Sequence, residues 1–328
     1  MAIVVCCFIS FQLAYFFNHF LKFKNNETTG VDNSIDSNDR IFFHETSGRT
    51  ELSFRQTCAV ESAALHNPNR PVQVFIQPEP NANINSSSVW RQVLNNYSNV
   101  QVIVIGDVGL YFKDSPVEQW YVKGEWRMSE YRVQHMSDFI RIVSLKKDGG
   151  MYLDLDIITL KPYDGPRFRN FVTSKNSQLY RLVNGVMHFD RGHRFIDQIL
   201  QVQAHEYDAS DYTFCGPEAM TTVMSNVCNF TRGDWTSNSC TDVYLLPHYY
   251  FFPIKDQTGY IYFFPYKAKR VLNFVKQMKE ISYGAHLHNF VTGSLSIDTR
   301  SNSTQVYALM AAEHCPVSFA NSQQFLSI

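Results

Sequence analysis

The chain of 328 residues carries 29 Lys and Arg against 30 Asp and Glu, which gives a formal net charge of -1. This balance, without basic runs, offers no electrostatic basis for binding nucleic acid. The 45% hydrophobic and 18% charged residues exclude a disordered chain, and the length suits one large α/β domain with appendages.

Residues 1–21 are almost wholly apolar, and no charge precedes Lys22. Such a run approaches the roughly 20 residues that span a bilayer. A cleaved signal peptide is the alternative, but no small-x-small cleavage site follows the run. We therefore expect a single-pass signal anchor over residues 1–21.

The orientation of this anchor involves two conflicting signals. Lys22 and Lys24 follow the span, which by the positive-inside rule places the globular part in the cytosol. Glycosylation sequons act only in the secretory lumen, and together they favour a type II protein with a lumenal domain. Five Asn-x-Ser/Thr sequons are present, at Asn26, Asn85, Asn96, Asn229 and Asn302.

Residues 22–40 are polar and turn-prone, which predicts a stem. The globular part, residues 41–328, alternates apolar β-branched runs with segments of helical periodicity, which predicts a mostly parallel sheet flanked by helices. Strands are expected at 40–45, 72–76 and 100–105, and helices at 54–66, 88–97, 129–147, 195–205 and 218–228.

The segment 129–147 carries the first functional signal. Asp138 and Arg141 are three residues apart, so they project as neighbours from one helix. Gly149 and Gly150 end this helix, because glycine reaches the left-handed conformation common at helix C-termini. The apolar stripe of the helix is predicted at Val133, Met136, Ile140 and Val143.

A short buried strand at 151–155 then delivers Asp154 and Asp156. Residues i and i+2 of a strand point the same way, so both carboxylates can converge on one hard cation. A cation shared with a diphosphate is what handling a nucleotide-sugar requires. The alternative for a lone Asp-x-Asp is a solvated turn.

Asn184 and Gly185 lie between two apolar runs, 179–183 and 186–189, which is typical of a hairpin turn. The cysteines favour disulfides over structural zinc, because no Cys-x-x-Cys or His-rich spacing is present. Cys228 and Cys240 are the first candidate pair, and the odd number of cysteines beyond the apolar run leaves at least one without an intrachain partner.

These motifs resemble the animal α1,4-glycosyltransferases, which carry the Asp-x-Asp sugar-binding motif. The resemblance covers nearly all of residues 41 to 320, and His288 departs from it because the family usually has Trp there. It rests on the segments 41–47 (IFFHETS), 58–64 (CAVESAA), 137–141 (SDFIR), 149–156 (GGMYLDLD), 184–185 (NG), 216–218 (GPE) and 286–289 (HLHN).

The resemblance implies a GT-A-type, Rossmann-like catalytic domain with a mostly parallel mixed sheet behind the anchor. It also implies a Golgi enzyme that uses Mn²⁺ or Mg²⁺ to transfer galactose or an N-acetylhexosamine from a UDP-sugar to a glycosphingolipid or glycoprotein glycan. In this reading Asp154, Asp156 and His286 bind the metal, and Asn184 lies at the donor or acceptor site instead of in a hairpin. The donor is expected to contact Asp138, Arg141, Gly150, Tyr152, His286 and Asn289.

The family retains the donor's α configuration, which requires a carboxylate nucleophile or a front-face route in which the leaving phosphate takes the acceptor proton. Glu218 and Asp190 are the acceptor-side carboxylate candidates, although either could instead be an acid at a helix N-terminus. We prefer the front-face route. Alternative functions are the use of another nucleotide sugar, such as GDP-mannose, and a non-catalytic glycan-binding or chaperone-like relative.

Overall fold

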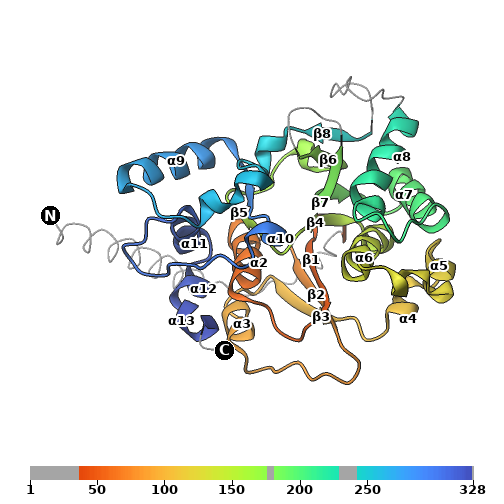
Figure 1. Cartoon of the computed structure of the whole chain (residues 1–328), viewed down its shortest axis with the longest axis horizontal. Helices are drawn as coiled ribbons and strands as arrows, with labels where there is room; N and C mark the ends of the chain where they lie inside the picture. Colours follow the sequence, from red (N-terminus) through yellow and green to blue (C-terminus); the bar gives the residue numbers. More distant parts are fainter. Residues whose placement is uncertain (1–36, 176–180, 229–241, 327–328) are drawn as a thin grey trace, which may run out of the picture. The chain divides into compact units, whose positions relative to one another are not determined.

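Seven strands form the central sheet, in the order β3-β2-β1-β4-β7-β6-β8. The computed structural model describes residues 37–175, 181–228 and 242–326, and these described residues belong to one compact unit (Figure 1). The strands are β1 (Ile41–Gly48), β2 (Val72–Pro78), β3 (Val100–Val104), β4 (Gly150–Leu153), β6 (Phe171–Ser174), β7 (Leu182–Phe189) and β8 (Tyr244–Leu246).

The sheet is mixed and mostly parallel, as predicted. Strands β1 to β4 run parallel to one another, and β8 runs parallel to β6. Strand β7 runs antiparallel to both β4 and β6. Strand β3 is an edge strand with partly exposed residues instead of the buried run that its apolar sequence suggested, and Val104 is half-exposed.

Helices cover both faces of the sheet (Figure 1). Phe42 points into the core under α6, while Ile41 and Phe43 point into the core under α2, as the two-residue period of a strand requires. One layer contains α4 (Val108–Phe112), α5 (Glu118–Lys123), α6 (Arg132–Asp148), α7 (Arg194–His205) and α8 (Ala219–Cys228), and the other contains α2 (Phe54–His66) and α3 (Val89–Leu94).

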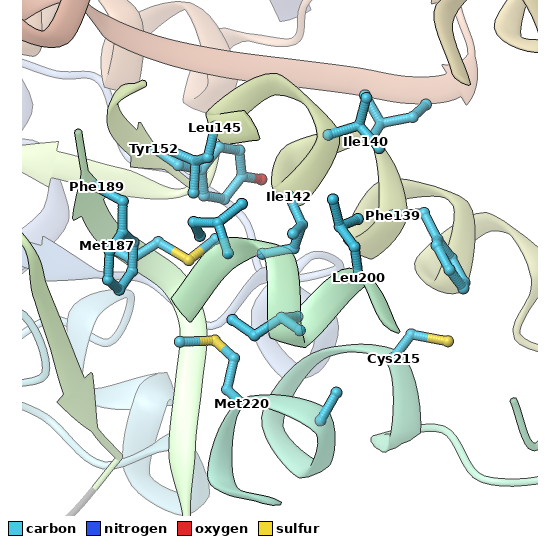
Figure 2. Packing of buried hydrophobic residues seen from close by; sticks show 14 of the residues in the cluster. Phe139, Ile140, Ile142, Leu145, Tyr152, Met187, Phe189, Leu200, Cys215 and Met220 are labelled. Atoms are coloured by element: carbon cyan, nitrogen blue, oxygen red, sulfur yellow. The ribbon is translucent and has the colours of Figure 1, made fainter. Parts of the chain in front are cut away.

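Helix α6 is the predicted helix at 129–147. Met136, Ile140 and Val143 are buried in the cluster that also contains residues of β4, β7, α7 and α8, part of which is drawn in Figure 2. Val133 is 40% exposed, so its place in the buried stripe was predicted wrongly. Gly149 and Gly150 end the helix with φ angles of +67° and +105°, which confirms their predicted role.

Among the other predicted helices, one has the predicted bounds and the rest differ from the observed ones at their ends. Helix α2 has the predicted bounds, with Ser53 and Gln56 forming a capping box. Helix α3 is shorter than the predicted 88–97. Helix α8 begins after a π-helical turn at Phe214–Glu218 that contains Pro217, whose missing N–H cannot continue a regular ladder.

The hairpin interpretation of Asn184 and Gly185 is wrong, because β7 continues through both residues. The strand pairs with β4 from Gly150↔Phe189 to Leu153↔Val186, and with β6 at Thr173↔Val183 and Ser174↔Leu182. The Asn-Gly pair therefore lies beside the end of β4, and a local turn signal is overridden by strand pairing.

A smaller module packs beside the sheet. Its strands β5 (Ile157–Thr159) and β9 (Gly284–His286) pair antiparallel, and its core includes residues of α2. Its helices are α9 (Ala268–Ile281), α10 (Asn289–Thr292), α11 (Val306–His314), α12 (Pro316–Ala320) and α13 (Ser322–Leu326).

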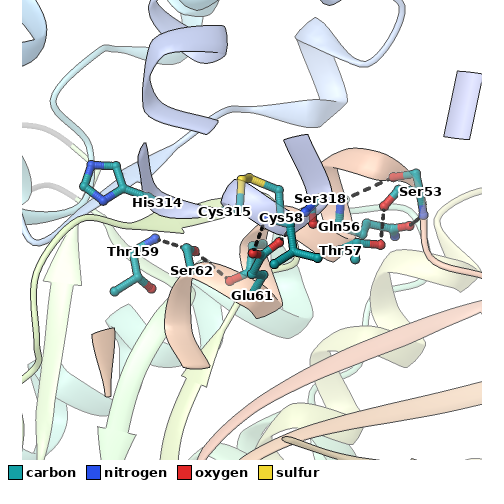
Figure 3. Close-up of a disulfide and its surroundings, with 12 residues drawn as sticks. Ser53, Gln56, Thr57, Cys58, Glu61, Ser62, Thr159, His314, Cys315 and Ser318 are labelled. Carbon is teal, nitrogen blue, oxygen red and sulfur yellow. Dashed lines mark hydrogen bonds between the residues drawn. A yellow bond between two sulfur atoms is a disulfide. The ribbon is translucent and has the colours of Figure 1, made fainter. Parts of the chain in front are cut away.

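A disulfide joins Cys58 of α2 to Cys315 between α11 and α12, with Cα atoms 5.1 Å apart (Figure 3). The sequence did not indicate this pair. Cys215 is a buried free thiol, in line with the odd cysteine number. The proposed partner of Cys228, Cys240, lies outside the described residues.

The predicted anchor at 1–21 and the stem up to residue 36 lie outside the described residues as well. Among the helices of the described part, none has the length and apolar character to cross a membrane.

Candidate active site

The site lies where the order of the sheet reverses. The chain passes outward from β1 through β2 and β3 and returns to β4 on the other side of β1. Ligands of open α/β sheets bind beyond the carboxyl ends of strands at such a reversal. Glu45 and Ser47 near the end of β1 line the same pocket as Asp154, which directly follows β4.

The two aspartates converge by a turn instead of by strand alternation. Strand β4 ends at Leu153, and the backbone N–H of Ile157 donates to the carbonyl of Asp154 at 3.1 Å. Asp154 and Asp156 therefore lie at either end of a tight turn between β4 and β5. The predicted strand over 151–155 was two residues too long, although the carboxylates do come together.

Strand β9 brings the third metal-ligand candidate from far along the chain. His286 pairs with Ile157, immediately after the turn. Its Nε2 lies 3.6 Å from Asp154 Oδ2 and 3.3 Å from Asp156 Oδ1. Ligand atoms of the three residues lie within 4.8 Å of one another.

The other oxygen of each carboxylate is held by the protein. Asp154 Oδ1 accepts from Arg141 Nη1 at 3.0 Å and from the Tyr152 hydroxyl at 2.7 Å. Asp156 Oδ2 accepts from the backbone N–H of Asn289 at 2.7 Å. The outer oxygens thus fix the orientation of both groups, while the inner oxygens face His286.

Arg141 connects the helix to the turn. Its guanidinium donates to the carbonyl of Asn184 at 3.0 Å and lies 3.4 Å from Asp138 Oδ1. It also stands over the ring of Tyr152, 4.5 Å from the centroid. Asn184 Nδ2 in turn donates to Asp138 Oδ1 at 2.7 Å. The predicted neighbours Asp138 and Arg141 are confirmed as a pair, and they belong to a buried network.

The ionisation of these groups follows from burial and charge. Burial disfavours the charged form of Asp154, but the positive charge of Arg141 outweighs it and lowers the pKa of Asp154. Burial raises the pKa of Asp156, partly offset by His286. Burial opposes a charge on His286, yet Asp156 and Asp154 raise the pKa of the imidazole. Burial also raises the pKa of Asp138 to about 6, against the attraction of Arg141.

Gly185 is required by close approach of the backbone. Its carbonyl accepts from the N–H of Asp154 at 2.8 Å. A Cβ at this position would lie 2.5 Å from Asp154 Oδ2. A larger residue here would displace the carboxylate, which explains a glycine in the middle of a strand.

A pocket of about 410 Å³ opens over these residues. It is lined by Asp138, Arg141, Tyr152, Asn184 and Asn289, as well as by the two aspartates. Lining residues that the sequence did not nominate include three polar or aromatic side chains: His44, Gln56 and Tyr212.

One of these three has a detectable signal. Gln56 fits the capping box of α2, which marks a helix start without indicating a site, and its Nε2 donates to Glu45 Oε2. No local pattern in the sequence marks His44 or Tyr212.

Three sequence-nominated residues lie elsewhere. Glu218 forms an ion pair with Arg181 at 3.1 Å, and Asp190 forms one with Arg169 at 2.8 Å. Neither lines the pocket. Gly150 packs against Arg40 at the opposite end of β4, so its contribution is to the backbone turn and not to the pocket.

His288, at the position where the family usually has Trp, is buried and lies in the left-handed region with φ of +57°. Its ring lies 4.6 Å from that of His286, and its Nε2 bonds to the carbonyl of Ile254 at 2.8 Å. The ring of His288 therefore packs against that of His286 and is held in place by the carbonyl of Ile254.

The site combines three side chains that could hold a divalent metal with an arginine-centred polar pocket. Residues 53–177 match the glycosyltransferase sugar-binding region containing the DXD motif, and residues 188–322 match the alpha 1,4-glycosyltransferase conserved region. The chain belongs to the alpha 1,4-glycosyltransferase family and is a glycosyltransferase.

The similar proteins include two enzyme types. The chain is 29% identical to lactosylceramide 4-alpha-galactosyltransferase of Pan troglodytes over 288 residues, 87% of this chain and 78% of that protein. It is 26% identical to human alpha-1,4-N-acetylglucosaminyltransferase over 301 residues, 90% of this chain and 83% of that protein. A crystal structure of the galactosyltransferase LgtC with sugar analogues aligns with a TM-score of 0.42 at 14% identity, over 86% of this chain and 95% of LgtC.

Proposed function

We propose that this protein is a metal-dependent, retaining α1,4-glycosyltransferase of GT-A type that acts in the Golgi lumen. It transfers galactose or an N-acetylhexosamine from a UDP-sugar to the terminal sugar of a glycosphingolipid or a glycoprotein glycan. The observation that carries the proposal is the convergence of Asp154 Oδ2, Asp156 Oδ1 and His286 Nε2 at the reversal of the sheet.

The three side chains fit a divalent metal. Two inner carboxylate oxygens and one imidazole nitrogen face one another, and the outer oxygens are already satisfied by protein donors. Burial opposes a charge on His286, but the two aspartates raise the pKa of the imidazole, so the position favours positive charge. Carboxylates suit Mn²⁺ and Mg²⁺, and the imidazole favours Mn²⁺ of the two. When bound, the metal would neutralise the charge that develops on the departing diphosphate.

The protein's own residues supply the rest of the donor site. Arg141 keeps its charge in the buried network and is oriented by Asp138 and by the carbonyl of Asn184. A planar guanidinium in this position matches phosphate oxygens and sugar hydroxyls. Across the pocket, Glu45 is fixed by Ser47 and Gln56 and presents carboxylate oxygens suited to ribose or sugar hydroxyls.

The arrangement favours the front-face route. Glu218 and Asp190 are engaged by arginines outside the pocket, so neither supports the nucleophile role. In the proposed step, the acceptor hydroxyl oxygen bonds to C1 of the donor sugar while the bond from C1 to the diphosphate oxygen breaks. The electron pair leaves with UDP, and the hydroxyl proton passes to a phosphate oxygen on the same face.

The cellular location rests on the amino-terminal segment and the sequons. The apolar run at 1–21 supports a signal anchor, and five sequons support a lumenal domain. The disulfide between Cys58 and Cys315 is also in keeping with an oxidising compartment.

The test is sugar transfer by the full chain, produced in a secretory host and solubilised in mild detergent. UDP-galactose, UDP-N-acetylglucosamine, UDP-N-acetylgalactosamine and GDP-mannose are offered with Mn²⁺ and glycolipid acceptors. We expect transfer from one UDP-sugar, abolished by a chelator and by Asp156→Asn but not by Asp298→Asn, which removes a partly exposed acid paired with Arg300 outside the pocket. Transfer that persists in Asp156→Asn would overturn the proposed metal role.

A further inference from the structure

Two aromatic side chains meet at the edge of the pocket. Tyr212 lines the pocket, and Phe290 follows Asn289, which also lines it. Their ring centroids are 5.5 Å apart with an interplanar angle of 37°. Tyr212 is 38% exposed and Phe290 80% exposed. The pair therefore offers apolar ring surface to whatever occupies the space beside the donor pocket.

Both rings are carried by backbone that is tied to the site. The carbonyl of Asp211 accepts from His135 Nε2 at 3.1 Å, and the ring of Tyr131 packs edge-on against Tyr212 at 5.3 Å. On the other side, the N–H of Asn289 donates to Asp156. The backbone therefore fixes the position of the aromatic pair relative to the carboxylates of the site.

The position of Phe290 is also fixed from behind. Arg55 Nη1 donates to Asn289 Oδ1 and to the carbonyl of Thr292, each at 3.0 Å, so both ends of α10 are held. A single exposed Phe is ordinary on a protein surface. Phe290, in contrast, is fixed by its backbone and meets a Tyr from a different segment beside a charged pocket. The two rings therefore form a defined binding surface.

The chemistry of this surface selects one kind of occupant. The pocket interior, with Arg141 and its acids, suits a charged nucleotide-sugar. A hexopyranose has an apolar face of C–H groups and a polar edge of hydroxyls, so it can lie with that face on aromatic rings while its hydroxyl points at the donor. The acidic residues nominated for the acceptor, Glu218 and Asp190, are held by arginines elsewhere.

We propose that Tyr212 and Phe290 form the acceptor subsite, on which the terminal hexose of the acceptor glycan stacks. This inference rests on the proposed function, because it assigns the second substrate of that reaction. Both side chains are positioning residues, since they hold the acceptor and do not take part in bond changes.

The experiment uses the full chain in detergent, with Tyr212→Ala, Phe290→Ala and the double variant. We expect the acceptor KM to rise roughly 10-fold for each ring removed, while the donor KM, the hydrolysis of donor by water and Mn²⁺-dependent UDP binding stay within about twofold. Tyr212→Phe and Phe290→Tyr should keep most of the acceptor affinity, because they keep the ring.

Matched controls are Tyr244→Ala and Phe264→Ala, which remove rings that are 49% and 48% exposed and do not line the pocket. A double variant with an unchanged acceptor KM overturns the subsite. An equal loss of UDP binding also overturns it, since the rings would then support the donor site.

A binding measurement separates this inference from the proposed function. Saturation-transfer NMR with lactose, the disaccharide in the name of the galactosyltransferase relatives, is recorded on wild type and double variant with UDP and Mn²⁺. If wild type transfers no sugar but binds lactose through these rings, the subsite stands and the transferase proposal fails. If wild type neither transfers nor binds lactose, both fail.

Discussion

Glu61 and Asp156 are buried acidic groups and Asp154 is partly buried, but the hydrogen-bond partners of Glu61 differ in kind from those of the two aspartates. Glu61 Oε1 accepts from the Tyr97 hydroxyl and from Val317 N–H, and Oε2 accepts from Ser318 N–H, at 2.6 to 2.8 Å. These donors fix α2 to the start of α12, next to the disulfide (Figure 3). Both oxygens of Glu61 are bound by donors of the protein itself.

In Asp154 and Asp156, by contrast, the two oxygens of each carboxylate have different surroundings. One oxygen of each is held by Arg141 or by the backbone of Asn289, and the other faces His286. A buried charge needs compensation. At Glu61 the fold supplies all of this compensation, so the carboxylate has a structural role. Where two carboxylates each turn one oxygen toward the other, a bound cation can supply the remaining compensation.

The largest expected effect separates activity from stability at Asp154. Asp154→Asn keeps an oxygen for Arg141 and Tyr152 but places an amide toward His286. Sugar transfer should fall by roughly a thousandfold, which corresponds to an activation barrier higher by about 4 kcal/mol. The free energy of unfolding should change by about 1 kcal/mol or less. Parallel activity assays and melting curves test this, and a large loss of stability with normal activity would reverse the comparison.

The disulfide beside Glu61 should matter for stability alone. Replacing Cys58 and Cys315 by serine opens a link between positions 257 residues apart. We expect a loss of about 2–5 kcal/mol in the free energy of unfolding, with kcat unchanged for the folded enzyme. Urea unfolding under non-reducing conditions measures it, and a change below about 1 kcal/mol would show that α2 is held without the bridge.

Glu61→Gln should destabilise the fold by about 2–3 kcal/mol, because an amide cannot accept from all the donors that face this position. The expected KM values are those of wild type. Chemical denaturation compared with Glu313→Gln, whose acid is an exposed partner of Lys279, provides the measurement. An effect on metal binding would contradict a purely structural role.

The pH dependence of metal binding should report His286. Metal binding requires a neutral imidazole, and the pKa of His286 is raised above 6.5 by the two aspartates. Mn²⁺ affinity should therefore fall by up to about tenfold per pH unit as pH drops below that raised pKa. Calorimetric titration of Mn²⁺ across pH 5–8 measures this slope, at about 1.4 kcal/mol per tenfold change.

In metal-free protein, the contribution of His286 to stability should have the opposite pH dependence. Protonated His286 between two carboxylates stabilises the fold below its unfolded pKa of about 6.5, and this contribution is lost as pH rises through the raised folded pKa. The difference in melting temperature between wild type and His286→Ala should therefore become smaller as pH rises. A difference that does not vary with pH would exclude the charged pair.

The smallest effect is expected behind the site, at His288. His288→Phe leaves the carbonyl of Ile254 without its donor, which should cost about 1 kcal/mol. His288→Trp restores the usual family residue and supplies an N–H. The melting temperature of His288→Trp should be higher than that of His288→Phe. The reverse order would indicate that side-chain volume, and not the hydrogen bond, determines stability at this position.

Much of the candidate site was predictable because its parts are close in sequence. Asp138 and Arg141 are one helical turn apart, and Asp154 and Asp156 flank one residue, so backbone geometry alone brings each pair together. The glycine pair that ends α6 needs a positive φ, which is a local requirement as well. The alternation of helices and strands likewise indicated the sheet class.

Other features depended on how the chain returns on itself. The meeting of Cys58 with Cys315, of Tyr212 with Phe290, and of Glu61 with α12 leaves no periodic trace in the sequence. The hairpin interpretation of Asn184 failed for the same reason, since pairing with β4 outweighed a local turn preference.

The family, the carboxylates of the candidate metal site and the class of sheet could be predicted from the sequence, because motifs and short-range periodicity encode them. The contact of Arg141 with the outer oxygen of Asp154, the ion pair of Glu218 outside the pocket and the aromatic pair at the pocket's edge became visible only in the folded chain. The physical reason is that long-range contacts are set by the packing of whole elements, which no local pattern encodes.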